Sequence, residues 1–202
     1  MTASEPKSGD GPVKANQASM RARATPILTL SLVGLLAVGG GLAQEVAPST
    51  SQLKAAFLYN FAKFVEWPPE AFGEAKSPIV IGILGEDPIP IRGDLERAIV
   101  GKTINNRPLE IKPFRSAVDA TNCHLLYIGA SEQAHLKQIL ESLGGASVLT
   151  VGETDDFIQK GGMINFIQEK GKFRFQISEA TAKSVHLKIS SKLLSLASRT
   201  AR

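Results

Sequence analysis

The side chains that most often carry out chemistry are few in this sequence. There is one cysteine, Cys123, and His124, one of three histidines, follows it directly. Neighbouring residues of a strand point to opposite faces, so Cys123 and His124 do not form a nucleophile–base dyad on a strand. A single cysteine excludes an intrachain disulfide and a multi-cysteine zinc site, and the histidines lack the i, i+4 spacing of helical metal ligands. We expect Cys123 to be a buried, inert thiol.

Other motifs for catalysis or ligand binding are incomplete. Gly82 and Gly85 lie near the end of an apolar run, but the third glycine of a dinucleotide loop and the lysine of a Walker motif are absent. No G-x-S-x-G nucleophile elbow is present. Glu153, Asp155 and Asp156 are of the kind that bind a hard cation, but they lack a ligand-loop pattern, and we interpret the adjacent pair Asp155-Asp156 as a solvated turn. The sequence therefore predicts no catalytic residues, no metal site and no cofactor.

The segment that ends in two prolines carries the residues most suited to binding. The only tryptophan, Trp67, stands directly before Pro68, and large aromatic side chains at such a rim often anchor interfaces. The alternative, which we favour, is that Trp67 closes the core over the first strand. Asn60 occupies a helix-interior position where its propensity is poor, so it either bonds a loop or is solvated. The candidates for binding a partner or ligand are Tyr59, Asn60, Lys63, Glu66 and Trp67.

The N-terminal segment has the form of an export signal. Residues 1–19 are polar and aperiodic, and we interpret them as disordered or as an over-long start before Met20. Two arginines then precede an uncharged apolar run that ends in the small residues Gly41-Leu42-Ala43. We expect a cleaved signal peptide over residues 20–43 and a single exported domain over residues 44–202. An uncleaved membrane anchor is the alternative, which three consecutive glycines near its end disfavour.

Composition fits an exported globular domain. Hydrophobic residues make up 43% and charged residues 21%, which excludes a disordered or fibrous chain. The net charge of +4 is mildly basic, but no block of five like charges follows the predicted signal, so nucleic acid is a poor partner. No second apolar run reaches membrane length.

Helices and strands alternate through the first two-thirds of the predicted domain. In the first helix, apolar residues recur as a stripe of Leu53, Phe57, Phe61 and Phe64, widened by Ala56, Tyr59 and Ala62. Alternation of this kind predicts a mostly parallel sheet with right-handed crossovers and helices on both faces. The predicted helices span 53–67, 91–101 and 131–143, the last capped by Ser131, and the strands span 79–84, 109–114, 123–128 and 147–151.

The last third of the chain follows a different pattern. Residues 163–168 and 173–177 alternate around a turn in which Gly171 can take a positive φ, which predicts a β-hairpin. Ser178 caps a short helix, residues 186–190 form a last strand, and residues 190–197 form a closing helix. We therefore predict a single three-layer α/β domain, with an antiparallel hairpin near the C-terminal edge of a mostly parallel sheet.

A sheet of this type offers a place for a small ligand. Parallel sheets open crevices at the carboxyl ends of their strands, which here fall at 85–87, 129–130 and 152–153. One hypothesis is therefore a small-ligand-binding domain that feeds a membrane sensor, receptor or transporter. The alternative for these loops is that they only turn the chain.

Seven segments resemble the YfiR-like periplasmic proteins. They occur in the order found in that family, they cover nearly all of the chain after the predicted signal, and GGMINFI together with ISSKLL is specific. The segments are LKAAFLYNFAKFVEWP (53–68), IVIGILGEDP (79–88), GKTINNRPLEI (101–111), CHLLYIGASE (123–132), SVLTVGE (147–153), GGMINFI (161–167) and LKISSKLLSLA (187–197).

The resemblance implies a non-enzymatic periplasmic regulator without catalytic residues. Such a protein holds an inner-membrane sensor protein inactive, either a diguanylate cyclase or a histidine kinase, and its release of a cyclase raises cyclic-di-GMP and favours biofilm formation. Relatives form homodimers and are controlled by an outer-membrane lipoprotein or by redox state. The redox-sensitive relatives use several cysteines, so with Cys123 alone this chain has no thiol switch within one chain.

Overall fold

The computed structural model describes residues 47–86 and 91–198 of the 202-residue chain. The predicted signal peptide over residues 20–43 and the polar start before it lie outside the described residues. The domain boundary predicted at residue 44 therefore stays a prediction.

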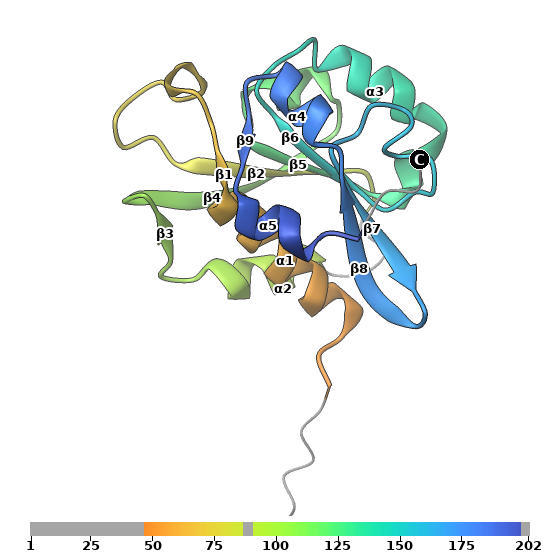
Figure 1. Ribbon diagram of the computed structural model, residues 1–202. Helices are drawn as coiled ribbons and strands as arrows, with labels where there is room; N and C mark the ends of the chain where they lie inside the picture. Colours follow the sequence, from red (N-terminus) through yellow and green to blue (C-terminus); the bar gives the residue numbers. More distant parts are fainter. Residues whose placement is uncertain (1–46, 87–90, 199–202) are drawn as a thin grey trace, which may run out of the picture. The chain divides into compact units, whose positions relative to one another are not determined.

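A mostly parallel sheet of seven strands forms the centre of the fold (Figure 1). Its spatial order is β3-β4-β2-β5-β6-β7-β8, in which β3 and β8 run antiparallel to their neighbours at the two edges. Both the α/β class and the antiparallel hairpin at one edge confirm the prediction. The strands are β2 (Ile79–Leu84), β3 (Thr103–Ile104), β4 (Arg107–Phe114), β5 (Leu125–Ile128), β6 (Leu149–Gly152), β7 (Ile164–Glu169) and β8 (Lys172–Ile177).

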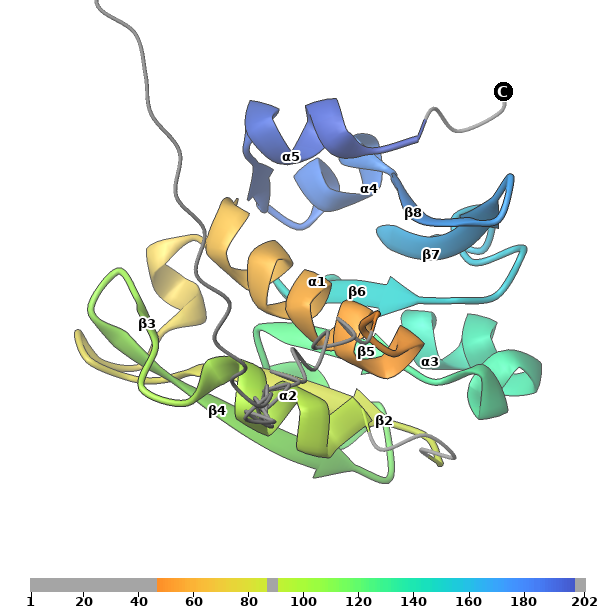
Figure 2. The same cartoon turned by 90° about the horizontal axis from the view of Figure 1, so that it is seen from below.

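Helices cover both faces of this sheet and produce two separate cores. Alternate residues of β2 show the division, since Ile81 packs in the first core and Val80 in the second. On the first face α1 and α2 lie side by side (Figure 2) together with α4 and α5, and α3 lies on the second face. The helices are α1 (Thr50–Phe64), α2 (Ile91–Ile99), α3 (Leu136–Ser142), α4 (Glu179–Ser184) and α5 (Ser191–Leu196), and the 3-10 turns are η1 (Pro69–Ala71), η2 (Val118–Asn122) and η3 (Ala130–His135).

The first helix begins and ends three residues earlier than predicted. A capping box starts it, because the Ser49 hydroxyl accepts from the Gln52 N–H at 3.2 Å while the Gln52 side chain accepts from the Ser49 N–H at 2.9 Å. It ends at Phe64, where the chain becomes extended. The next two residues form β1 (Val65–Glu66), which pairs antiparallel with β9 (Lys188–Ile189) in a second, two-stranded sheet.

The buried face of α1 is rotated from the predicted apolar stripe. Leu53 and Phe57 are only half-buried and Ala56 is exposed, which corrects the prediction. The side chains facing the core belong to Ser51, Lys54, Ala55, Leu58, Phe61 and Ala62. The rotation is possible because α2 and the loop after β6 supply polar partners for Ser51 and Lys54, while Phe57 packs against aromatic rings of the β7–β8 hairpin.

Two further elements differ from the sequence predictions. The helix expected from Ser131 begins as the 3-10 turn η3, and the Ser131 hydroxyl accepts from the Glu86 N–H at 3.1 Å instead of capping α3. The strand expected at 186–190 shortens to β9, which pairs with β1 in the two-stranded sheet. The hairpin turn matches its prediction, with φ values of +51° at Lys170 and +73° at Gly171.

Candidate functional site

A small hollow lies where the order of the parallel strands reverses. The chain passes from β2 to β4 on one side and then crosses to β5 on the other, so the loops that follow β2 and β5 diverge. Gly85, Gly129 and Glu153 line the hollow, as the crevice prediction placed them, over an apolar floor that includes Ile83 and Ile91. Its volume of about 50 Å³ holds a few water molecules, at about 10–15 Å³ for each.

A buried ion pair stands at the mouth of this switch-point hollow. Lys54 of α1 donates from Nζ to Glu153 Oε2, and the Tyr127 hydroxyl of β5 donates to Glu153 Oε1 at 2.5 Å. The side chain of Lys54 is 10% exposed and that of Glu153 is 23% exposed, so both charges are largely removed from water. A pair of this kind contributes little net stability, but either charge becomes costly when its partner is removed.

Sequence reasoning missed Lys54. The predicted apolar stripe through Leu53 and Phe57 did not include it. A signal was present in the spacing of Ala55, Leu58 and Ala62, which places a second set of small and apolar residues at i, i+3 and i+7. Lys54 lies next to that face. This position indicates that its side chain is buried and that its ammonium group therefore needs a buried partner.

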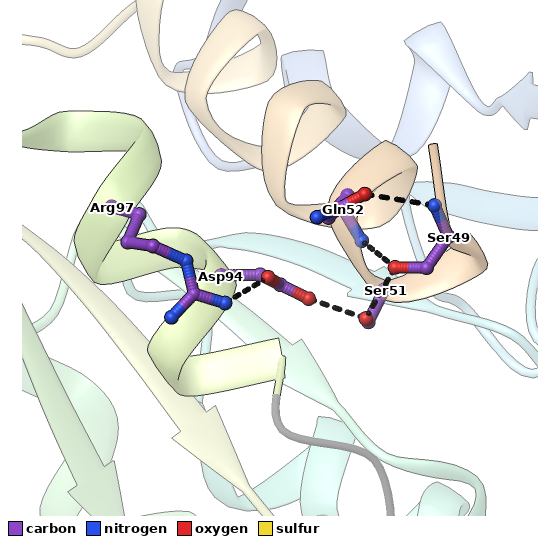
Figure 3. Close-up of polar contacts among 5 residues, drawn as sticks. All are labelled: Ser49, Ser51, Gln52, Asp94 and Arg97. Carbon is purple, nitrogen blue, oxygen red and sulfur yellow. Dashed lines mark hydrogen bonds and ion pairs between the residues drawn. The ribbon is translucent and has the colours of Figure 1, made fainter. Parts of the chain in front are cut away.

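A second polar contact fixes the start of α1 against α2 (Figure 3). The Ser51 hydroxyl donates to Asp94 Oδ2, and Arg97 donates from Nη2 to Asp94 Oδ1. The Ser51 hydrogen bond, followed by the Arg97 interaction, lowers the pKa of Asp94 against the opposing effect of burial. Because Asp94 is buried and ionised, it holds the first turn of α1 in place, and Lys54 in the next turn is thereby directed at Glu153.

The hollow continues into a wider and more polar depression. This depression has a volume of about 520 Å³ and shares Lys54 and Glu153 with the hollow. It extends over Gln168 and Gln176 of the β7–β8 hairpin. Glu153 is thus an anchored carboxylate able to accept from a ligand, but within residues 47–86 and 91–198 no three His, Cys, Asp or Glu side chains are placed to hold a metal ion.

A second polar and aromatic cluster lies at the opposite, amino-terminal ends of β2 and β5. The Trp67 Nε1–H donates to the His124 carbonyl oxygen at 3.0 Å, and the Val80 N–H donates to His124 Nδ1 at 3.1 Å. The Phe72 ring stacks on His124 with ring centroids 4.6 Å apart, and Arg107 Cζ lies over the Phe72 ring, 3.8 Å from its centroid. Burial lowers the pKa of His124, the Ala71 carbonyl opposes this shift, and the Arg107 charge adds to it.

The residues proposed from the sequence for binding fall in different surroundings. Tyr59 is half-buried under the Lys102 ammonium group, 4.4 Å from the ring centroid, and Asn60 is half-buried on α1. Lys63 is exposed, 5.8 Å from the Phe64 centroid. The structure brings only the last two candidates, Glu66 and Trp67, into one groove.

Cys123 is buried beneath the second face of the sheet. Burial raises the pKa of its thiol to about 12, so the group is protonated at neutral pH. This confirms the expectation of a buried thiol.

Comparison with known families identifies the chain. Residues 51–198 match the family DUF4154, described as YfiR/HmsC-like, which accounts for nearly all the described residues. The chain belongs to the YfiR/HmsC-like family. This family is regulatory, periplasmic and non-catalytic, and it suggests a regulator of cyclic-di-GMP signalling. No helix within the described part of the chain is both long and apolar enough to span a membrane.

A solved structure supports the fold of this YfiR/HmsC-like protein. The present chain is similar to the crystal structure of a conserved domain protein from Vibrio cholerae O1 biovar El Tor strain N16961, with a TM-score of 0.51 and 12% sequence identity. The match covers 76% of this chain and 60% of the Vibrio chain, so the present chain spans only part of that protein's length. The search of curated proteins gave no match.

Proposed function

We propose that this protein is a periplasmic regulator that binds and restrains an inner-membrane signalling protein, specifically a diguanylate cyclase. The observation that carries the proposal is the family match over residues 51–198. The release of restraint then raises cyclic-di-GMP and favours biofilm formation. A homodimer and control by an outer-membrane lipoprotein belong to the same proposal, because the family resemblance implies both.

Restraint of this kind is a shift of population between two states of the partner. The regulator must bind the inactive state more tightly than the active state, since equal binding shifts nothing. To change the ratio of inactive to active partner from 1:99 to 99:1, the regulator must bind the inactive state about 5.5 kcal/mol more tightly than the active state. A single protein interface with a well-packed aromatic anchor supplies energies of that order.

Deletion of the gene tests the proposal. Cells lacking the protein should contain more cyclic-di-GMP and form more biofilm, and the full-length gene should reverse both changes. A matched control is the same gene without residues 20–43, which we expect to fail because its product stays in the cytoplasm. Unchanged cyclic-di-GMP in the deletion strain would exclude the proposed function.

A small-ligand-binding role is the second candidate, and the switch-point hollow favours it. Lys54 and Glu153 stand at its mouth and join it to the larger depression. A thermal-shift screen of the purified protein against periplasmic metabolites tests this role. A hit that stabilises the wild type but not the Tyr127→Phe variant, which keeps the ring and removes the hydroxyl, would support it. An absence of any stabilising compound would exclude it.

A further inference from the structure

A groove opens beside the two-stranded β1–β9 sheet, away from the switch-point hollow. Its volume is about 510 Å³, and we call it the β1–β9 groove. Its lining includes Glu66, Trp67, Pro68, Lys183, His186, Leu187 and Lys188. They come from β1 and the residues directly after it, and from the segment running from α4 to β9, which are far apart in the sequence.

The floor of the groove is apolar and needs no further hydrogen bonds. The Nε1–H of Trp67 is already bonded to the His124 carbonyl at 3.0 Å, so the half-buried indole offers an apolar surface. Pro68 has no N–H, and Leu187 is almost completely buried. A partner side chain that covers this floor therefore leaves no donor of these side chains unpaired, which is the property of interface anchors.

The rim of the groove is basic. Lys188 is exposed and makes no ion pair among the described residues, and Lys183 pairs only with Glu179, 2.7 Å away on the same helix. Two more lysines lie beyond the groove, where Lys63 of α1 and Lys192 of α5 both approach the Phe64 ring, at 5.8 and 5.3 Å.

Only part of this charge is neutralised within the chain. Glu66 lies opposite Lys188 in the β1–β9 register, and Glu179 pairs with Lys183. Counting Lys183 and Lys188 of the groove with Lys63 and Lys192 beside it, four lysines stand against the two glutamates Glu66 and Glu179, so the complement of this surface is negatively charged.

His186 occupies a backbone conformation that favours glycine. Its φ is +62°, and it follows the end of α4 in a turn closed by the Leu187 N–H donating to the Ala182 carbonyl at 3.0 Å. Glycine adopts this conformation without steric strain. The imidazole is therefore a side chain that the local fold does not require, and it lines the groove.

From these observations we propose that the β1–β9 groove docks an acidic segment of the membrane partner, with an apolar side chain of that segment lying over Trp67. This inference rests on the proposed function and names the surface that carries it. Complementary charge accelerates encounter and selects the partner, and the apolar contact holds it.

Charge reversal at the rim tests the inference in living cells. The double variant Lys183→Glu, Lys188→Glu should be exported and folded, yet lose most of its ability to lower cyclic-di-GMP in the deletion strain. The control Lys112→Glu, Lys137→Glu makes the same charge change at exposed positions on β4 and α3, and should restrain like the wild type. His186→Gly should weaken restraint while leaving the melting temperature unchanged or raised. Because glycine suits the positive φ at this position, His186→Gly should stay folded, so that a loss of restraint reports on the groove and not on misfolding.

Three results separate the possibilities. Restoration of restraint to the double variant by Glu→Lys or Asp→Lys changes in the periplasmic part of the cyclase would establish the contact. Full restraint by the double variant would contradict the assignment of the groove as the docking site and leave the proposed function intact. Unchanged cyclic-di-GMP in the deletion strain would contradict both the proposed function and the docking site. Binding of the wild type to phosphatidylglycerol vesicles, lost in the double variant and without effect on cyclic-di-GMP, would assign the groove to a membrane surface and overturn the proposal.

Discussion

The two ends of the central sheet differ in where the charged side chains of their sites lie. Those of the ion pair at the carboxyl end are largely buried, and the lysines near the amino end are exposed. At the carboxyl ends of the strands, Lys54 and Glu153 are drawn inside and satisfy each other, with Tyr127 as a third member. At the amino ends, the rings of Trp67 and Phe72 pack around His124. Lys183 and Lys188, which line the β1–β9 groove with Trp67, are exposed. The first end is thus held by a buried ion pair and the second by packed aromatic rings.

This difference separates stability from recognition. A buried charge cannot be changed without a large effect on folding, because its partner is left unpaired. Exposed lysines contribute little to folding, and their substitution alters what the surface binds. Substitutions at the two ends should therefore give opposite patterns of lost stability and lost restraint.

Removing the buried ammonium group should have the largest effect on stability. Lys54→Met leaves Glu153 without its cation, and we expect a loss of about 3 kcal/mol in the free energy of unfolding, measured by urea denaturation. The control Lys160→Met breaks the more exposed pair with Asp156 and should cost about 0.5 kcal/mol or less. Adding Glu153→Leu to Lys54→Met should recover much of the loss. Equal effects of Lys54→Met and Lys160→Met would contradict the contrast between buried and exposed charge.

The carboxyl end should also be intolerant of added volume. A Cβ atom at Gly152, directly before Glu153, would lie 2.2 Å from the Phe157 ring, and this ring is fully buried. We expect Gly152→Ala to cost about 2 kcal/mol, because the ring must move within a packed core. Gly73→Ala is the control, since its Cβ would meet nothing closer than Ser77 Oγ at 3.9 Å. A neutral Gly152→Ala variant would show that this end is loosely packed.

The amino end should respond to pH through His124. Burial holds the pKa of this imidazole below its value of about 6.5 in the unfolded chain, so the unfolded chain takes up more protons as the pH falls through that value. Stability should therefore be complete above about pH 6.5 and decrease below it. Urea denaturation at pH 7.5 and 5.5 measures this decrease, which should be smaller than the effects of the two substitutions above. His124→Asn should flatten the pH dependence, and an unchanged slope would refute the assignment to His124.

The smallest effects on folding should come from the β1–β9 groove. Lys188→Glu should change the free energy of unfolding by about 0.5 kcal/mol or less, since the residue is exposed and forms no ion pair among those described. His186→Gly should be neutral or stabilising by a similar amount, because glycine relieves the positive φ. Thermal melts of purified variants measure both. A loss above about 2 kcal/mol in either would show that this end also has a structural role.

Periodicity and turn chemistry were enough to predict the layers of the fold. The fully apolar run Ile79–Leu84 and the Lys170-Gly171 turn each follow local rules, and both were confirmed. The burial of Lys54 follows instead from Glu153, 99 residues later, and no local pattern contains that contact. For the same reason the pairing of β9 was not predicted, since its partner β1 is a two-residue strand formed where a helix was predicted.

The candidate binding residues were predictable only in part. Trp67 and the two prolines mark the end of α1 in the sequence, and the groove forms there. The other half of the groove comes from the segment that runs from α4 into β9, and the pairing of β9 with β1 brings this segment to Trp67. Tyr59 was grouped with Trp67 by proximity in the sequence, but on the helix it points toward Lys102.

Reconstitution of the restraint from purified parts tests the central claim most directly. Each membrane diguanylate cyclase of the source cell is placed in proteoliposomes, and the protein is added on the side of its periplasmic portion. For one of these cyclases, the rate of cyclic-di-GMP synthesis should fall with increasing protein and level off at saturation. Rates that stay unchanged for every cyclase at saturating protein would contradict the claim that this protein acts by binding and restraining such an enzyme.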